Sequence, residues 1–334
     1  GLGDVYKRQL YDHSRTTAAL ATAIWRYHRD RGDDAEVVRA RLRDRNRPDW
    51  DEAKLLLIQG DFFGIQEFIF ATGGETQRRA AKLLRGRSFY VSLLTECAAL
   101  RILERLALPP TSQVINAAGK FLIVAPNTEE AVQALGQTQA ELDAWFLEHT
   151  YGQSGIGLAW LPARCNDFLR AEKGGEAPFR DLIRRLFEQL QTAKTRRFDL
   201  CGVGAPASVF SDFLARFSAE RGVCAVDGRS PATEPLSDTG RHVGALALDQ
   251  IAVGEHLAHT RRVLVTDRPL GDKALKLPLF GCYIQFTGAE DETGRFGPVA
   301  RDGGLRRAWD FGLPEAVDAP LFDGYARRYI NGYL

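Results

Sequence analysis

A continuous apolar run, LLLIQG at residues 55–60, is the feature that most limits how this chain can fold. Apolar residues without alternation predict a central strand whose two faces are both buried. The sequence GDFFG (60–64) follows at once and leads into GIQEFIF, whose pattern predicts a short helix. A buried strand that turns through the acid Asp61 therefore stands at the start of the best-defined domain.

The segments after this strand predict the next elements of the domain. Residues 78–106 carry an apolar stripe at helical spacing, which predicts a long helix that ends before Pro109. QVINAAGKFLIVAP (113–126) contains two β-rich runs around a small, turn-forming Ala-Ala-Gly and predicts a hairpin. The stripe consists of Phe89, Leu93, Cys97, Leu100, Leu103 and Leu106.

A second helix is predicted after the hairpin, because Asn127 or Thr128 can cap it and Glu130 lies close to a capping-box position. GIGLAW (155–160) supplies a last strand. Strand, helix, hairpin, helix, strand is the βαββαβ order of a ferredoxin-like α+β sheet with helices on one face. Because that fold hosts many functions, the site residues must decide between them.

The flanking segments are predicted mainly as helices and loops. Residues 10–30 place Ala18, Ala21, Ile24 and Trp25 at helical spacing, which predicts one buried helix face, and a boundary is expected near residue 50 after Pro48. Further predictions are helices over 179–193, 207–221 and 243–259, a loop over 222–242, strands over 262–266 and 282–287, and a loop-rich remainder.

Composition excludes several classes of protein. Lys plus Arg (44) nearly equals Asp plus Glu (43), so no net field indicates nucleic acid or membrane as a partner. No apolar stretch approaches the roughly 20 residues of a membrane helix. Five scattered cysteines give neither a disulfide framework nor a Cys-x-x-Cys metal knuckle, and favour a reducing, cytoplasmic setting. The absence of methionine favours a fragment of a longer protein.

Asp61 has more than one interpretation. Palm-type phosphoryl transfer uses two metal ions held by acids from the turn after the first strand and from the following hairpin. Asp61 occupies the first place, but the hairpin 116–120 offers no carboxylate at the second. One interpretation is a nucleotide-binding turn that uses backbone N–H groups near Gly64 and the charge of Lys120, and the other is a carboxylate that caps a helix.

A basic run in QRRAAKLLRGRSFY is the second candidate site, with Arg78, Arg79, Lys82, Arg85 and Arg87 as its cations. Arg78, Lys82 and Arg85 fall on one helical face, where they can grip phosphate groups. A solvated helix face is the alternative.

Two smaller features complete the candidates. Metal-dependent phosphohydrolases use adjacent His-Asp pairs, and Asp12-His13 is such a pair, but His28 is the only other histidine nearby. A cap and a surface imidazole at a helix start are the alternative. Cys224 is a single thiol and makes no zinc site by itself. The sequence contains no Walker loop, Rossmann fingerprint or Gly-x-Ser-x-Gly elbow.

Three motifs, in this order and spacing, resemble a known family: GDFFGIQEFIF, AAKLLRGRSFYVSLLTE and INAAGKFLIVAPNTEEA. They are similar to the first palm domain of the large signature subunit of type III-A CRISPR interference complexes. LYDHSRTTAA (10–19) is similar to a segment late in the HD nuclease domain of that family. LPLFGCYIQF and GYARRYINGY resemble the segment before its second palm.

The resemblance implies four parts: an HD-domain remnant (1–50) that holds Asp12 and His13, a first palm (51–165), a helical inter-palm domain (166–261), and strands with a linker (262–334). It implies single-strand DNA cleavage in the HD domain and synthesis of cyclic oligoadenylates from ATP, with Mg²⁺ or Mn²⁺, between two palms. The decisive acids and the His-Asp motif would lie outside this chain. Implied partners are guide RNA, target RNA, single-stranded DNA and the other protein subunits of the complex.

The chain departs from the family at two places. Its hairpin reads Ala117-Ala118-Gly119 where the family usually has a glycine triplet. The zinc knuckle between the palms keeps one cysteine of four; the corresponding positions are Cys224, Asp227, Gly244 and Ala247. We therefore expect no zinc there.

The preferred hypothesis is a palm that binds ATP for a catalytic palm elsewhere in the parent protein. The expected nucleotide-binding residues are Gly60, Asp61, Phe62, Phe63, Gly64, Asn116, Ala117, Ala118, Gly119 and Lys120. One alternative is a non-catalytic scaffold that holds guide RNA and neighbouring subunits through the basic run. A nucleotide-cyclase-like regulator shares the palm, but requires an acidic hairpin that INAAGKF does not provide.

Overall fold

The computed structural model describes residues 2–43, 47–169, 175, 177–196, 198, 213–237, 239–260, 262–271, 274–287, 304–310 and 328–329. The chain divides into two compact units, each assembled from separate segments. Unit 1 comprises Gly1–Phe63, Ala98–Ala144 and Gly155–Ala207, and unit 2 comprises Gly64–Cys97, Trp145–Ser154 and Ser208–Leu334. This division into two units does not test the four predicted domain ranges, which stay a prediction.

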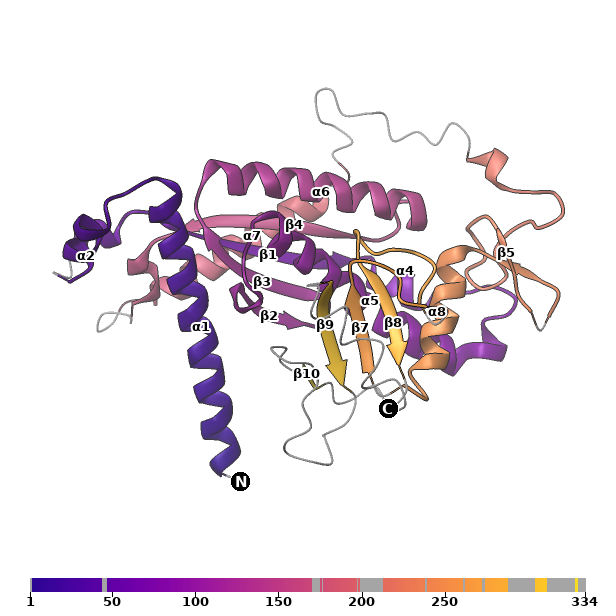
Figure 1. Ribbon diagram of the computed structural model, residues 1–334. Helices are drawn as coiled ribbons and strands as arrows, with labels where there is room; N and C mark the ends of the chain where they lie inside the picture. The colour runs from indigo at the N-terminus through magenta and orange to yellow at the C-terminus, as the bar shows by residue number, and fades with distance from the viewer. Residues whose placement is uncertain are drawn as a thin grey trace. The chain divides into compact units, whose positions relative to one another are not determined.

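Unit 1 is built on a four-stranded sheet of order β2-β3-β1-β4 (Figure 1). All neighbouring strands are antiparallel. The predicted order of strand, helix, hairpin, helix and strand is confirmed. Along the chain these elements are β1 (Leu55–Phe63), α5 (Ala80–Arg105), β2 (Gln113–Ala117), β3 (Lys120–Pro126), α6 (Glu129–Thr150) and β4 (Gly155–Ala163), with the one-turn α4 (Ile65–Ile69) between β1 and α5. Helix α4, residues 80–97 of α5 and residues 145–150 of α6 belong to unit 2.

Strand β1 is buried along nearly its whole length, as the apolar run predicts. One face of the sheet packs against α1 (Leu2–Asp30) and α7 (Pro178–Thr195), in a core that includes Leu55, Leu57 and Leu186. On α6, the Gln139 side chain donates to the Ile156 carbonyl of β4 at 3.0 Å. The sequence predicts helices on one face for the βαββαβ order alone; α1 and α7, which lie outside that order, add a cover over the face that carries Leu55 and Leu57.

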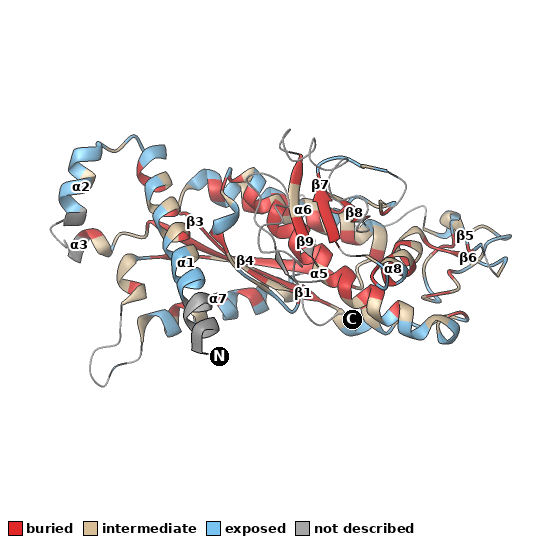
Figure 2. Ribbon diagram, turned by 60° about the horizontal axis from the view of Figure 1, so that its bottom comes forward, coloured by how far each residue is buried: buried red, intermediate tan, exposed pale blue. Residues whose placement is uncertain are grey.

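Helix α1 is confirmed, but its predicted buried face is wrong by one residue. Ala19 and Ala23 are fully buried, whereas Trp25 is 58% exposed and lies under the Arg29 guanidinium. Small side chains let the helix backbone approach the sheet closely, and this outweighs the larger apolar area of Trp25. Most side chains at 10–17 are exposed (Figure 2).

The predicted cap of α6 and the predicted apolar stripe of α5 agree with the structure. The Ala131 N–H donates to Thr128 Oγ1 at 3.2 Å, so Thr128 caps α6. All six residues of the α5 stripe are buried. The predicted helix at 179–193 is α7, and two short helices, α2 (Ala35–Arg43) and α3 (Arg47–Trp50), precede the sheet.

Unit 2 contains a second four-stranded sheet of order β10-β9-β7-β8. Its members are β7 (Arg262–Thr266), β8 (Tyr283–Thr287), β9 (Leu305–Asp310) and β10 (Arg328–Tyr329). The strands at 262–266 and 282–287 are confirmed, but β9 falls in the predicted loop-rich remainder and was missed. A two-stranded pair, β5 (Glu234–Pro235) and β6 (His242–Val243), lies in the predicted loop 222–242 and extends one residue beyond it.

Helix α8 (Ala245–His256) confirms the helix predicted over 243–259 and crosses α5 at very short range within unit 2. A Cβ added at Gly86 would overlap the Gln250 carbonyl, and one added at Gly254 would overlap the Lys82 carbonyl. The two helices thus touch through their backbones, which only glycine permits.

Two predicted segments lie partly outside the described residues. Of the helix predicted over 207–221, residues 207–212 are not described, and the described part contains only the 3₁₀ turn Leu214–Arg216. Of GYARRYINGY, only Arg328 and Tyr329 are described. Within the described part of the chain, no helix has the length and apolarity needed to cross a membrane.

The turn of the β2–β3 hairpin provides a test of stability. Ala118 (φ 53°) and Gly119 (φ 78°) both lie in the left-handed region, as a two-residue type I′ turn requires. Alanine is strained there, so Ala118→Gly should raise the free energy of unfolding by about 0.5–1 kcal/mol in chemical denaturation. Ala117→Gly, in the adjacent strand, is the matched control and should lower it. A change of the same sign in both variants would contradict the strain argument.

Candidate functional site

Asp61 lies inside β1 and not at a helix start. It pairs with Lys120 of β3 on one side and Gly157 of β4 on the other, and it is only 3% exposed. The residue before α4 is Gly64 at φ 73°, and no side chain caps that helix. The cap interpretation of Asp61 is therefore wrong, because strand pairing continues through Phe63 and leaves the carboxylate on a sheet face.

Two lysines from different elements of unit 1 surround the Asp61 carboxylate. Lys194, in the last turn of α7, hydrogen-bonds Asp61 Oδ2. Lys120 Nζ lies 3.8 Å from the same oxygen. Gly157 makes room for this contact, because a Cβ there would lie 3.3 Å from Lys194 Cγ. Sequence reasoning found Lys120 but missed Lys194, which is 133 residues from Asp61 in sequence.

An aromatic ring lies beside these charges. Lys120 Nζ is 5.1 Å from the ring centroid of Phe187 on α7, close enough for a cation–π contact. Phe187 is 39% exposed and the Lys120 side chain is 42% exposed. The Asp61 carboxylate, by contrast, is closed off from solvent. A ligand would therefore meet the lysines and the ring before the acid.

The charge of the site suits a phosphate better than a divalent metal ion. Two like unit charges at 4 Å repel by about 1 kcal/mol in water and about 4 kcal/mol at an effective dielectric constant of 20, and a divalent ion doubles this. A metal ion on Asp61 would therefore be opposed by Lys194 and Lys120. Nowhere in the described ranges do three or more His, Cys, Asp or Glu side chains gather in a way that could hold a metal ion.

The structure brings the strand and hairpin candidates of unit 1 together. The Phe62 N–H donates to the Gly119 carbonyl at 2.9 Å, and Gly60 faces Phe121 with no space for a side chain. The rings of Phe62 and Phe63 are buried, so a ligand could use only their backbone. Gly64 belongs to unit 2, and its five-residue helix is too short to add a strong anion site.

Within the basic run, Arg87 is a structural residue. It is 1% exposed, and its guanidinium donates over 2.6–3.3 Å to Gln250 Oε1 and to the carbonyls of Ile69, Ala71 and Val226. Burial lowers its pKa. Its prediction as a nucleic-acid or subunit contact is wrong, because every nitrogen already donates inside unit 2.

The other cations of the run differ in their accessibility. Lys82 forms an ion pair with Glu255 of α8. Arg79 and Arg85 are partly buried, and Arg78 is exposed in the 3₁₀ turn Gln77–Arg79 that precedes α5. Any contact with phosphate groups or a partner would therefore depend mainly on Arg78.

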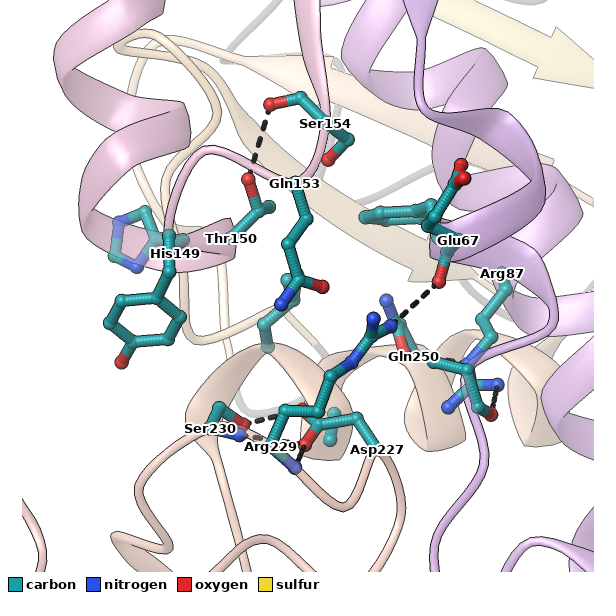
Figure 3. A pocket seen from close by; sticks show the side chains of 15 residues that line it. Glu67, Arg87, His149, Thr150, Gln153, Ser154, Asp227, Arg229, Ser230 and Gln250 are labelled. Carbon is teal, nitrogen blue, oxygen red and sulfur yellow. Dashed lines mark hydrogen bonds between the residues drawn. The ribbon is translucent and has the colours of Figure 1, made fainter.

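A small cavity of unit 2 lies beside Arg87 (Figure 3). Its volume of about 50 Å³ is far below the roughly 300 Å³ at which ligand pockets begin, and it has room for one or two water molecules. Arg229 donates to the Glu67 carbonyl across it at 3.0 Å. Burial lowers the pKa of His149 at its edge, which favours the neutral imidazole. The cavity is too small for a nucleotide.

Two of the four positions of the degenerate knuckle, Cys224 and Asp227, lie in a loop closed by hydrogen bonds, and the other two, Gly244 and Ala247, lie at the start of α8. Asp227 Oδ1 accepts from the N–H groups of Arg229 (2.8 Å) and Ser230 (2.9 Å), and Ser230 Oγ also bonds this carboxylate. Cys224 and Ala247 are buried in one apolar cluster, and Gly244 lies against Ser230. Burial, followed by the charge of Asp227, raises the pKa of the Cys224 thiol. One protonated thiol and one engaged carboxylate do not fit zinc, which needs about four free donors.

Asp12 and His13 lie in the interior of α1, so their predicted place at a helix start is wrong. Both are exposed. His28 lies fifteen residues further on, roughly 22 Å along the helix axis, and its Nδ1 is 2.7 Å from Asp33 Oδ2. The three residues therefore do not form one site.

This chain is similar to known proteins that carry the name Csm1. Residues 54–205 match the model of the Csm1 subunit domain B. A relative from Thermococcus onnurineus, a CRISPR system single-strand-specific deoxyribonuclease Cas10/Csm1 (subtype III-A), is 37% identical over 190 residues, which are 57% of this chain and 22% of that protein. Its counterpart of the same description from Mycobacterium tuberculosis is 32% identical over 202 residues, 58% of this chain and 24% of that protein. The chain thus spans less than a quarter of the length of these relatives.

Solved structures share the fold. A Csm1–Csm4 subcomplex of the type III-A CRISPR-Csm interference complex aligns with a TM-score of 0.61 at 23% identity, over 94% of this chain and 34% of that one. A Csm1–Csm4 cassette in complex with one ATP aligns with a TM-score of 0.59 at 22% identity, over the same shares.

The structural role of Arg87 can be tested by Arg87→Lys. A lysine cannot reach four acceptors, so the variant leaves buried carbonyls unpaired and should lower the free energy of unfolding by about 3 kcal/mol. Arg78→Lys, at an exposed position, is the matched control and should change it by less than about 0.5 kcal/mol. Urea denaturation measures both. Equal effects would mean that Arg87 is not the buried donor described above.

The knuckle loop is expected to hold no zinc. Elemental analysis of the purified chain should give fewer than about 0.1 zinc per molecule, since a structural site needs four ligands. Cys165→Ala controls for non-specific binding of zinc by thiols. Stoichiometric zinc that disappears in Cys224→Ala but persists in Cys165→Ala would overturn this expectation.

Proposed function

We propose that in this chain, which belongs to the Cas10/Csm1 family of type III-A CRISPR large subunits, the sheet of unit 1 is a ferredoxin-like palm that binds ATP. The single observation that carries the proposal is the pair of lysines around Asp61, beside the exposed ring of Phe187. Ammonium groups suit phosphate oxygens and the ring suits a nucleobase. The nucleotide would then bind where the end of β1 that carries Asp61 pairs with Lys120, the first residue of β3.

The family adds support for this ligand class. Solved Csm1–Csm4 cassettes are described as complexes with one ATP, with pppApA and with cA3. The palm proposed here would bind ATP for cyclic oligoadenylate synthesis. A second palm of the parent protein would supply the acids and the Mg²⁺ or Mn²⁺ ions.

The remaining activities and partners of the parent protein are proposed from its relatives. The relatives are described as single-strand-specific deoxyribonucleases. An HD domain that ends near residue 50 would carry that activity in the parent protein. Residues 51–165 would be the palm, 166–261 the inter-palm domain with the zinc-free knuckle, and 262–334 the link to the second palm. Partners would be the other complex subunits, guide and target RNA, and single-stranded DNA, in the cytoplasm.

A second function, that of a scaffold for subunits or guide RNA, is favoured by the exposure of Arg78. The Csm1 structures are subcomplexes with Csm4, which fits a role in assembly. Because Arg87 is buried and Lys82 is paired, this function would rest on one exposed cation flanked by Arg79 and Arg85. The ATP proposal has the larger set of converging groups.

The ATP proposal is tested by calorimetry on the whole chain with ATP. Lys120→Ala should weaken binding at least tenfold, which corresponds to about 1.4 kcal/mol, because an exposed ammonium beside the hairpin is lost. Lys276→Ala removes a lysine of similar exposure whose partner is Glu234 of unit 2, and should leave the affinity unchanged. Absent binding, or equal binding by all three proteins, would refute the proposal and leave the scaffold function.

A further inference from the structure

Lys194 occupies a core-facing position of α7. Leu182, Leu186 and Leu190 form the stripe by which α7 packs on the sheet, and all three are fully buried. Lys194 follows Leu190 by four residues and so continues that stripe toward the sheet. A lysine on such a stripe needs an acidic partner, and Asp61 is that partner.

The lysine remains accessible from one side. Its side chain is 20% exposed, against 4% for that of Asp61. An ammonium has three N–H donors, so a bond to Asp61 is compatible with bonds to a phosphate oxygen. Lys120 approaches the same carboxylate from β3, so two ammonium groups from different elements lie beside one buried carboxylate.

We propose that Lys194 is a phosphate-binding residue for the nucleotide and that Asp61 is a positioning residue that holds Lys194 and Lys120 against the sheet, without binding a metal ion. This inference rests on the proposed ATP-binding function. It assigns the triphosphate to two lysines from elements far apart in sequence. It also assigns Gly157 a role, since its lack of a side chain leaves the path for the Lys194 stem.

The proposal separates phosphate recognition from metal binding, and this makes it testable. If Asp61 positions lysines, Asp61→Asn weakens ATP binding equally with Mg²⁺ and with EDTA. If Asp61 is a metal ligand, the loss appears only with Mg²⁺. Binding of adenosine, which has no phosphate, is unchanged in every variant under the proposal.

The experiment measures affinities of the whole chain for ATP, ADP and adenosine, each with Mg²⁺ and with EDTA. Lys194→Gln should weaken ATP binding at least tenfold and leave adenosine binding within twofold. Lys194→Arg, which keeps a positive charge, should restore ATP binding to within about threefold of the native chain. A purely structural role for Lys194 would change ATP and adenosine binding together, and that result would overturn the proposal.

A second variant guards against misfolding. Lys194→Gln leaves Asp61 with one partner fewer, whereas the double variant Asp61→Asn, Lys194→Gln removes both charges and preserves side-chain size. It should fold and bind ATP at least tenfold more weakly. ATP binding that depends on Lys120 but is native-like in both Lys194 variants would overturn this inference alone. No ATP binding by the native chain would refute the proposed function, and this inference with it.

Discussion

The burial of β1 on both faces is the constraint on which unit 1 depends. An apolar strand in the middle of a four-stranded sheet cannot be left half covered, so the sheet needs packing partners on each side. Leu182, Leu186 and Leu190 of α7 provide one of these covers, together with alanines of α1. The candidate site lies where this cover continues past the apolar part of the strand and meets Asp61.

This position explains the electrostatics of the site. A carboxylate in the buried strand requires a cation, and the helix that covers the strand supplies one in its last turn. A lysine near a helix C-terminus also interacts favourably with the carbonyl end of the helix. Lys120 lies at the start of β3 in the hairpin, so lysines from two separate parts of the chain approach one oxygen of Asp61.

Much of the fold could be predicted because it depends on local periodicity. The apolar run at 55–60, the stripe of α5 and the Thr128 cap all have signals within a few residues. Contacts between distant segments have no such signal. The basic run in the sequence includes Arg87 among the candidate phosphate-binding cations, but the burial of Arg87 depends on α8, whose Gln250 lies 163 residues away.

The same limit explains the remaining errors. Trp25 has the apolar area expected of a core residue, yet the approach of α1 to the sheet selects Ala19 and Ala23. The sequence allows Asp61 to cap a helix because a helical pattern begins directly after GDFFG, and only the pairing of β1 with two neighbours shows that the strand extends past Asp61. The sequence places Lys194 at the end of a predicted helix, in line with Leu182, Leu186 and Leu190. Its role could not be predicted, because that role depends on contact with Asp61, which is distant in sequence.

The crossing of α5 and α8 at Gly86 and Gly254 has a consequence for how this protein can vary. Where side chains separate two helices, homologous proteins can exchange large residues for small ones and the helices shift to compensate. Here peptide atoms touch peptide atoms, so no exchange of side chains can adjust the separation. The distance between α5 and α8 that lets Arg87 reach Gln250 therefore depends on both glycines. A substitution at either glycine would force the two helices apart and change the whole crossing.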